Sequence, residues 1–410
     1  MSIPTDCPQR DERMGWMGDA HLAAEATILN YDTAAYYENW LRTIANSQDE
    51  EGHVHDTSPA RWGGQDGSPP WAIAYPLTTW YLYRYYGDVR AVEEHYPNIV
   101  RWFGTLEGRA KDHIVEYCPY GDWVGVETTP GPLIATGAYY WTAEILAEFA
   151  TVLGKTDDAA QFGQRARDIA AAFNERFFNA DKGMYGNGSQ YSQIWPLYLG
   201  IAQEEQRQAA LDHLKREIVE KRNNHLATGI LGTKYVFDVL TDSGDVDLVY
   251  RFALQEDYPS WGYMIANGAT TLWELWANET GRGMNSHNHQ MFGSIVGWFF
   301  GGTAGINTLP EPGYRKFTIA PMITGDLDHA EAYTDTVHGR IASKWERSGQ
   351  GLQMWIEIPP NTQARVIVPN LGNAGATVLM DGASPATSGE AAASGVAYEL
   401  GSGKYHFDVR

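Results

Sequence analysis

The N-terminal part of this sequence holds a dense group of ionisable side chains. Four acids and two arginines fall within fourteen residues, interleaved with glycine and tryptophan: Asp6, Arg10, Asp11, Glu12, Arg13 and Asp19. Burial and repulsion between like charges raise the pKa of one carboxyl group, while an arginine keeps another ionised. Two acids with separated pKa values suit general acid catalysis. The alternative is a solvated charged loop or a structural ion-pair network.

A second candidate acid is Glu274, in the aromatic stretch NGATTLWELWANET. The spacing predicts a helix here, with Leu272 and Trp276 on one face. A carboxyl group buried among aromatic rings has a raised pKa unless it is hydrogen-bonded or hydrated, and such a group suits proton transfer. The alternative is an exposed acid on a helix.

Two histidines, His287 and His289, follow in the stretch NSHNHQMFGS. No third ligand with suitable spacing accompanies them, so the pattern favours hydroxyl recognition or helix capping and predicts neither a metal nor a cofactor. A Ca²⁺ ion held by scattered carboxylates would leave no such spacing.

Aromatic residues are abundant, with 15 Trp, 24 Tyr and 13 Phe. Many lie in loops rich in glycine, and three such loops are candidates for one pocket rim: Trp62–Gly64 with Trp71, Tyr120–Trp123, and Tyr258–Tyr263. Their flat faces suit sugar rings, although ordinary loop packing explains any one of them. Nucleotide-binding and acyl-transfer motifs are missing. Two acids with many tryptophans indicate glycoside hydrolysis.

The elements that must position these residues are mostly helices. Apolar spacing of three and four predicts close to twelve helices, near 19–29, 32–47, 73–86, 89–108, 135–153, 157–178, 190–200, 204–221, 229–241, 244–254, 267–277 and 288–301. Twelve helices in antiparallel pairs predict a toroid. Long connections at 50–71, 115–134 and 258–266 would gather at one end and form its pocket.

From about residue 303 the pattern changes to short runs of alternating apolar residues. The runs are KFTIAP, GRIASKWERS, LQMWIEIP, ARVIVPN, ATVLMDG, VAYELG and KYHFDV. They predict an all-β sandwich of seven or eight strands. The predicted organisation is therefore mainly α: a helical domain at 1–302 and a C-terminal β-sandwich domain at 303–410.

The composition limits the partners of this chain. Its 410 residues carry a formal net charge of −21, which would repel nucleic acid and anionic membrane surfaces. Long apolar runs and a signal peptide are both missing, so the chain as written is expected to be cytoplasmic. The two cysteines, Cys7 and Cys118, are expected to be free thiols.

Taken together, these motifs resemble a known family. The opening DCPQRDERMGWMGDA is similar to the signature of the α-L-rhamnosidases of glycoside hydrolase family 78, and YGDW, TTLWELW and NHQMFGS follow in the family's order. The tail pieces GYRKFTIAP, HGRIASKW and IPPNTQARVIVP resemble the β-sandwich that follows its catalytic domain. The resemblance implies an (α/α)6 barrel and an inverting mechanism on a rhamnose-containing glycoside or oligosaccharide.

The resemblance also implies roles for individual residues. Glu12 would be the general acid and Glu274 the general base, with carboxyl groups about 6.5–9.5 Å apart. The remaining implied residues contact the sugar: Asp6, Arg10, Asp19 and His289 its hydroxyl groups, and Trp16, Trp71 and Trp123 its ring and methyl group.

The sequence departs from the family in two places. The stretch WGGQDGSPPW stands where the family commonly has a shorter WGDA-like stretch, and the β domains that usually precede the barrel are not in this sequence. A natural minimal form and a truncated chain are both consistent with this. An apolar face left by those domains could be covered by a second copy, giving a homo-oligomer. There are two alternative functions: a glycosidase of different sugar specificity on the same barrel, and a sugar-binding protein without turnover.

Overall fold

The computed structural model describes residues 3–7, 13–61, 66–307, 311–349, 351–373, 375–382, 389–392 and 394–410. Contacts divide the chain into two compact units, which are described separately. The helical unit comprises Met1–Ala24, Ala35–Trp80 and Val89–Ser294. The β unit comprises Glu25–Ala34, Tyr81–Asp88 and Ile295–Arg410.

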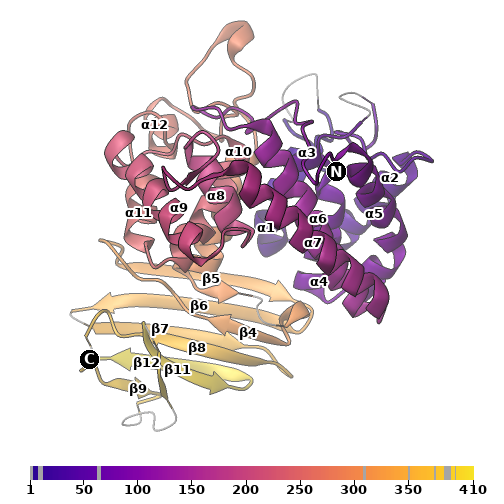
Figure 1. Cartoon of the computed structure of the whole chain (residues 1–410). Coiled ribbons are helices and arrows are strands. Elements are labelled where there is room, and N and C mark those ends of the chain that lie inside the picture. Colours follow the sequence, from indigo (N-terminus) through magenta and orange to yellow (C-terminus); the bar gives the residue numbers. More distant parts are fainter. Residues whose placement is uncertain are drawn as a thin grey trace. The chain divides into compact units, whose positions relative to one another are not determined.

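The helices follow one another with short or irregular connections (Figure 1). Among the described residues the α-helices are α1 (Met17–Asn30), α2 (Ala34–Ser47), α3 (Pro69–Ala72), α4 (Ala74–Tyr86), α5 (Val89–Arg109), α6 (Gly131–Val152), α7 (Thr156–Phe177), α8 (Gln190–Tyr198), α9 (Glu204–Arg216), α10 (Ile230–Asp242), α11 (Val246–Ala253), α12 (Trp261–Ala266) and α13 (Ile295–Trp298). A short hairpin of β1 (Phe178–Asn179) and β2 (Met184–Tyr185) lies between α7 and α8.

Two layers of helices can be distinguished by their burial. Most side chains of α6, α8 and α10 are buried, as expected of helices enclosed by other elements. By contrast, α7 buries a single stripe at three- and four-residue spacing, formed by Phe162, Ala166, Ile169 and Phe173. Helices α6 and α7 lie side by side, and α6 and α10 each contact α8 (Figure 1). The inner layer is therefore α6, α8 and α10, and α7 belongs to the outer one.

Ten of the twelve predicted helices are confirmed, with ends shifted by a few residues. The predicted helix 267–277 is wrong. There the backbone N–H of Glu274 donates to the carbonyl of Ser286 and that of His289 to the carbonyl of Leu272, each at 2.8 Å. The segment bonds to a distant stretch of chain instead of to itself, so Leu272 and Trp276 share no helical face.

The two segments on either side of 267–277 also differ from expectation. The predicted helix 288–301 is a succession of short pieces: a 3₁₀ turn at Met291–Ser294, α13, and a π turn at Phe299–Thr303. The expected loop 258–266 contains α12, whose N-terminus is capped by Ser260, because its Oγ accepts the backbone N–H of Tyr263 at 2.9 Å.

The β unit contains two five-stranded sheets, which have the strand orders β10-β11-β8-β4-β3 and β5-β6-β7-β12-β9 (Figure 1). The strands are β3 (Ile306–Asn307), β4 (Lys316–Ile319), β5 (His329–Thr336), β6 (Gly339–Ser348), β7 (Gly351–Ile358), β8 (Gln363–Pro369), β9 (Val378–Met380), β10 (Glu390–Ala392), β11 (Gly395–Leu400) and β12 (Gly403–Val409). Buried and half-buried side chains alternate along β7, as in a sandwich.

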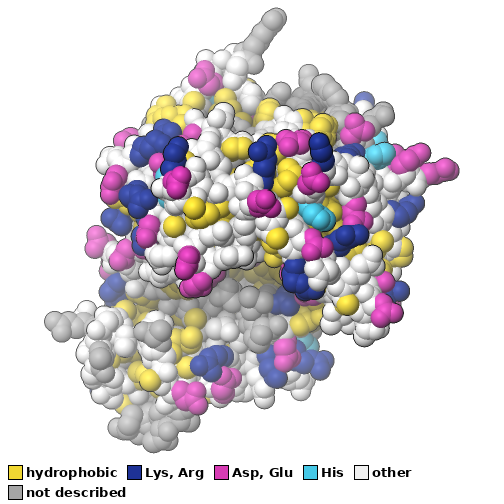
Figure 2. All heavy atoms as spheres, in the orientation of Figure 1, with side chains coloured by type: hydrophobic (Ala, Val, Ile, Leu, Met, Phe, Trp, Pro, Cys, Tyr) yellow, Lys and Arg dark blue, Asp and Glu magenta, His cyan; other side chains and the backbone are white. Residues whose placement is uncertain are grey.

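All seven predicted runs form strands. Strand β5 was not predicted because it lies at a sheet edge and buries only Thr334 completely, so its sequence HAEAYTDT has no apolar alternation. The domain boundary at 302 and 303 stays a prediction. Within the described residues, no helix is both long enough and apolar enough to cross a bilayer. On the face in Figure 2, acidic and basic side chains are interspersed over the helices.

The packing of α6 on α8 generates a first prediction. A Cβ atom at Gly137 would lie 2.0 Å from Nε1 of the buried Trp195, which donates to the carbonyl of Ile134 at 3.2 Å. We expect Gly137→Ala to destabilise the helical unit by about 1–3 kcal/mol, because the overpacking outweighs the gain in helix propensity of about 1 kcal/mol. Scanning calorimetry would show it as a lower unfolding midpoint.

The matched control for this prediction is Gly104→Ala in α5. No atom lies within 4 Å of a Cβ at Gly104, so only the propensity gain remains and the midpoint should stay or rise. Equal midpoints for the two variants would contradict the close approach of α6 and α8.

Candidate active site

A loop without helix or strand, residues 115–130, runs past the N-termini of two inner helices and is called the crossing loop below. Tyr120 donates its hydroxyl to Oδ2 of the fully buried Asp56 at 2.9 Å. Glu127 accepts the backbone N–H of Gln190 at the start of α8 at 2.5 Å. Polar side chains therefore fix this loop at two separate points.

A third anchor of the crossing loop is Asp122. Its carboxylate accepts three backbone N–H groups at the start of α10, at 2.7–3.2 Å: those of Gly229, Leu231 and Gly232. Burial raises the pKa of Asp122 to about 7, against the lowering effect of these three donors. The next residue, Trp123, accepts the N–H of Ile230 at 3.0 Å through its carbonyl, so its backbone is held against the same helix end.

The anchored Trp123 reaches the candidate base, Glu274. Its indole N–H donates to Oε1 of Glu274 at 3.1 Å, and the side-chain amide of Asn285 donates to the same oxygen at 3.2 Å. Glu274 is only 6% exposed. Two N–H donors on a buried carboxylate stabilise its charged form, which is the form that accepts a proton.

A buried ion pair lies beside this carboxylate. Nε2 of His289 is 3.1 Å from Oδ1 of Asp19, and the two side chains are 3% and 8% exposed. Burial alone would lower the pKa of His289, but the hydrogen bond and charge of Asp19 and the charges of Glu274 and Asp6 raise it above its ordinary value. Three carboxylates thus surround one imidazole.

Aromatic rings form a wall of the same region. Tyr120 has Trp71 at 4.9 Å, Trp16 at 5.6 Å and Trp123 at 6.4 Å between ring centroids. The Trp71 ring lies so close to α1 that a Cβ at Gly18 would be 2.5 Å from it. The three predicted tryptophans are therefore brought together by Tyr120.

Of the N-terminal cluster, Asp6 and Asp19 are buried at the site. Asp6 accepts the backbone N–H of Met14 at 2.8 Å and the thiol of Cys7 at 3.0 Å. Among the described residues, Cys7 and Cys118 are not joined in a disulfide. Arg10 and Glu12 lie outside the described residues, as does the rim segment Trp62–Gly64.

Comparison with known proteins places these features in a family. Residues 1–302 match the family described as the bacterial alpha-L-rhamnosidase 6 hairpin glycosidase domain, and residues 305–379 match the bacterial alpha-L-rhamnosidase C-terminal domain. This chain belongs to the bacterial α-L-rhamnosidase family. The (α/α)6 barrel and C-terminal β-sandwich expected from the sequence are confirmed by these matches and by solved relatives.

Several relatives are similar to nearly the whole of this chain. An alpha-L-rhamnosidase from Formosa agariphila is 34% identical over 381 residues, which are 90% of this chain and 41% of that protein. The rhamnosidase structures from Dictyoglumus thermophilum and Streptomyces avermitilis have TM-scores of 0.95 and 0.93, identities of 39% and 32%, and full coverage of this chain. The second was solved with L-rhamnose. This chain spans 47% and 40% of those chains.

Three residues of this rhamnosidase-family site were not singled out individually from the sequence: Asp56, Asp122 and Asn285. Asp56 precedes Thr57-Ser58-Pro59, which reads only as a turn. Asp122 was noted only as part of the Tyr120–Trp123 loop. Asn285 adopts a left-handed conformation with φ of 53°, which asparagine tolerates well, but such a preference predicts no contact with Glu274.

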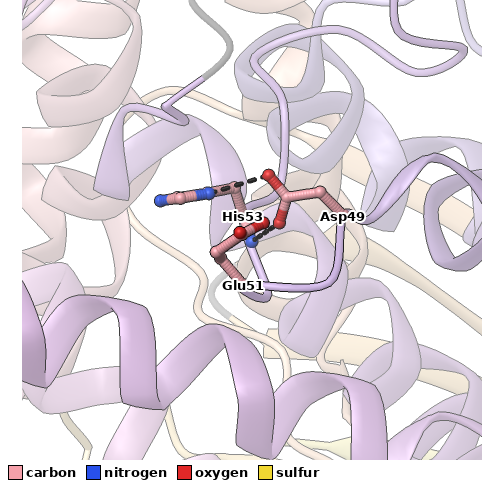
Figure 3. Close-up of side chains that lie close together, drawn as sticks. All are labelled: Asp49, Glu51 and His53. Atoms are coloured by element: carbon pink, nitrogen blue, oxygen red, sulfur yellow. Dashed lines mark hydrogen bonds and ion pairs between the residues drawn. The ribbon is translucent and has the colours of Figure 1, made fainter.

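One group of possible metal ligands occurs among the described residues: Asp49, Glu51 and His53 (Figure 3). Asp49 accepts the backbone N–H of His53 at 2.8 Å and lies 2.8 Å from its ring Nδ1. Both acids are exposed. The contacts between Asp49 and His53 close a turn after α2, which explains why these two side chains lie together.

The Asp19–His289 pair generates a second prediction. We expect Asp19→Asn to lower the pKa of His289, because burial still disfavours the imidazolium while the partner charge is gone. Imidazole NMR spectra over a range of pH would measure this, with His289→Gln for assignment. Because the folded pKa is raised, the pair stabilises the fold below the unfolded value of about 6.5, and this stabilisation is lost as pH rises through the folded value.

A control for this prediction is Asp257→Asn. Asp257 lies 2.8 Å from Nε2 of another histidine, His225, so its loss should leave the titration of His289 unchanged. A His289 pKa that is the same in Asp19→Asn as in the unmodified chain would refute the assigned pair.

Proposed function

We propose that this chain is the catalytic part of an inverting α-L-rhamnosidase that removes terminal α-L-rhamnose from glycosides or polysaccharides. The observation that carries the proposal is the buried carboxylate of Glu274, held by Trp123 and Asn285 beside the Asp19–His289 pair. The match of residues 1–302 to the family's glycosidase domain supports it. The match of the next domain from residue 305 supports a boundary near 302 and 303.

In the proposed reaction Glu274 is the general base. Its ionised form deprotonates a water molecule whose oxygen attacks the anomeric carbon of rhamnose. On the opposite face of the sugar the carboxylic acid of Glu12 gives its proton to the glycosidic oxygen as the bond from that oxygen to the anomeric carbon breaks. The products are β-L-rhamnose and the free alcohol, and proton exchange with water restores both acids.

Recognition of the sugar is proposed to divide between polar and aromatic side chains. Asp6, Asp19 and His289 are buried polar groups close to Glu274 and suit the hydroxyl groups of one pyranose ring. Arg10 would add a further contact to a hydroxyl. The wall around Tyr120, formed by Trp16, Trp71 and Trp123, suits the C–H face and methyl group of a 6-deoxy sugar. The solved relative from Streptomyces avermitilis, described as complexed with L-rhamnose, supports this choice of sugar.

The third prediction concerns both proposed catalytic acids. Glu12→Gln and Glu274→Gln should each lower kcat on p-nitrophenyl α-L-rhamnopyranoside by about 10²–10⁴-fold, because each loses a proton-transfer group but keeps its shape. Rhamnose binding, measured by calorimetry, should be largely retained. Full activity in either variant would show that the substituted residue is not the proposed acid or base. Release from a different p-nitrophenyl glycoside alone would favour another glycosidase on this barrel.

The fourth prediction separates inversion from retention. Proton NMR of the first product, recorded before mutarotation, should show β-L-rhamnose, since water attacks from the face opposite the leaving group. Initial formation of α-L-rhamnose would instead require a covalent intermediate and would contradict the assignment of Glu274 as a base.

A further inference from the structure

A hollow lies in the helical unit, between helices α4, α6 and α8. It has a volume of about 490 Å³, which falls within the range of about 300–1,000 Å³ typical of small-molecule sites. Its main side chains are four aromatic rings and two acids: Trp80, Tyr140, Trp141, Tyr198, Glu144 and Glu148.

This hollow is remote from the Glu274 site. The crossing loop lies at the N-terminal ends of the inner helices, where it contacts Gln190 of α8 and Gly232 of α10. The main residues of the hollow lie between the middle and the C-terminal end of α4, α6 and α8. Along α6, Glu144 is thirteen residues beyond the first residue, Gly131, which is about 20 Å along the helix axis.

Its aromatic rings are held in place by other side chains. The Trp141 ring makes edge contacts with Trp195, Tyr198 and Tyr235, at centroid distances of 5.5–5.8 Å. The indole N–H of Trp80 donates to Oε2 of Glu148 at 2.8 Å. Trp80, Tyr140 and Trp141 are half-buried, so part of their aromatic surface, including that of the two fixed tryptophans, remains open to a ligand. Rings that are already fixed lose little entropy when a ligand binds.

The polar groups of the hollow are two carboxylates one helical turn apart. Glu144 is exposed at the mouth of the hollow and Glu148 is half-buried. Partial desolvation raises the pKa of Glu144, the charge of Arg167 lowers it, and the charge of Glu148 raises it. Within the described part of the chain, no hydrogen bond to the Glu144 carboxylate is found, whereas Glu148 accepts the indole N–H of Trp80. Glu144 can therefore accept hydrogen bonds from a bound molecule.

The side chains that line the hollow indicate which class of ligand it would bind. An anion would be repelled by the two carboxylates, and a purely apolar ligand would remove them from water without a partner. The charge of Arg167 already acts on Glu144, and the indole N–H of Trp80 already donates to Glu148. The two acids therefore have less need of a bound cation. A neutral sugar offers C–H faces to the rings and hydroxyl donors to the acids.

We propose that this hollow is a second sugar-binding site, which takes a neutral pyranoside or short oligosaccharide. This proposal rests only on the residues of the hollow, so it does not depend on whether the chain hydrolyses rhamnosides. The site would hold a glycan against the barrel at a distance from the Glu274 carboxylate.

The test follows individual tryptophans. The full chain is labelled with 5-fluorotryptophan, and its ¹⁹F resonances are assigned with Trp80→Phe, Trp141→Phe, Trp71→Phe and Trp123→Phe. The probes are L-rhamnose, methyl α-L-rhamnopyranoside, maltotriose, a galacturonate oligomer and tetramethylammonium. The Trp80 and Trp141 signals report the hollow, while the Trp71 and Trp123 signals and p-nitrophenol release report the Glu274 site. Failure of one site is thereby distinguished from failure of the other.

At least one neutral probe should shift the Trp80 and Trp141 resonances saturably at millimolar concentration, and the galacturonate oligomer should not. Glu144→Gln should weaken this binding about tenfold, because a charged acceptor is replaced by a neutral one. The control Glu175→Gln, an exposed acid on α7, should have no effect. Unmoved Trp80 and Trp141 signals with all three neutral probes would overturn the proposal, as would shifts with tetramethylammonium alone.

Discussion

Three side-chain contacts hold the crossing loop in place, and the rest of the site depends on them. A loop with no regular backbone pairing must satisfy its polar groups in other ways. Here Tyr120, Asp122 and Glu127 do so against Asp56 and the N-termini of α10 and α8, where backbone N–H groups favour negative charge. This arrangement fixes the indole of Trp123, which in turn orients Glu274.

The same region concentrates negative charge around one histidine. Asp6, Asp19 and Glu274 all act on the single imidazole of His289. Each acid is also stabilised locally: Asp6 by the backbone of Met14, Asp19 by His289, and Glu274 by two side-chain N–H groups. Such groups, oriented before a substrate arrives, need no reorganisation during a reaction.

The sequence predicted the fold well where local periodicity matches burial. Helix α7 and strand β7 were recognised because their apolar residues repeat with the period of the element. Prediction failed at 267–277, where the carbonyl of Ser286 takes the backbone N–H of Glu274, a contact far along the chain that no local pattern encodes. The acids and tryptophans of the site were recognisable from their residue types. Asp56 and Asn285 were not, because their contacts with Tyr120 and Glu274 exist only in the folded chain.

The anchoring of the crossing loop also determines how this part of the protein opens. Each anchor ends on a different element, and those at Asp122 and Glu127 are bonded to backbone amides of α10 and α8 themselves. Release of the loop therefore exposes the first turns of both helices, and fraying of either helix removes one of the three anchors of the loop. We therefore expect the amide hydrogens of the loop and of the two helix ends to exchange together, in contrast to the independent fraying of an ordinary surface loop.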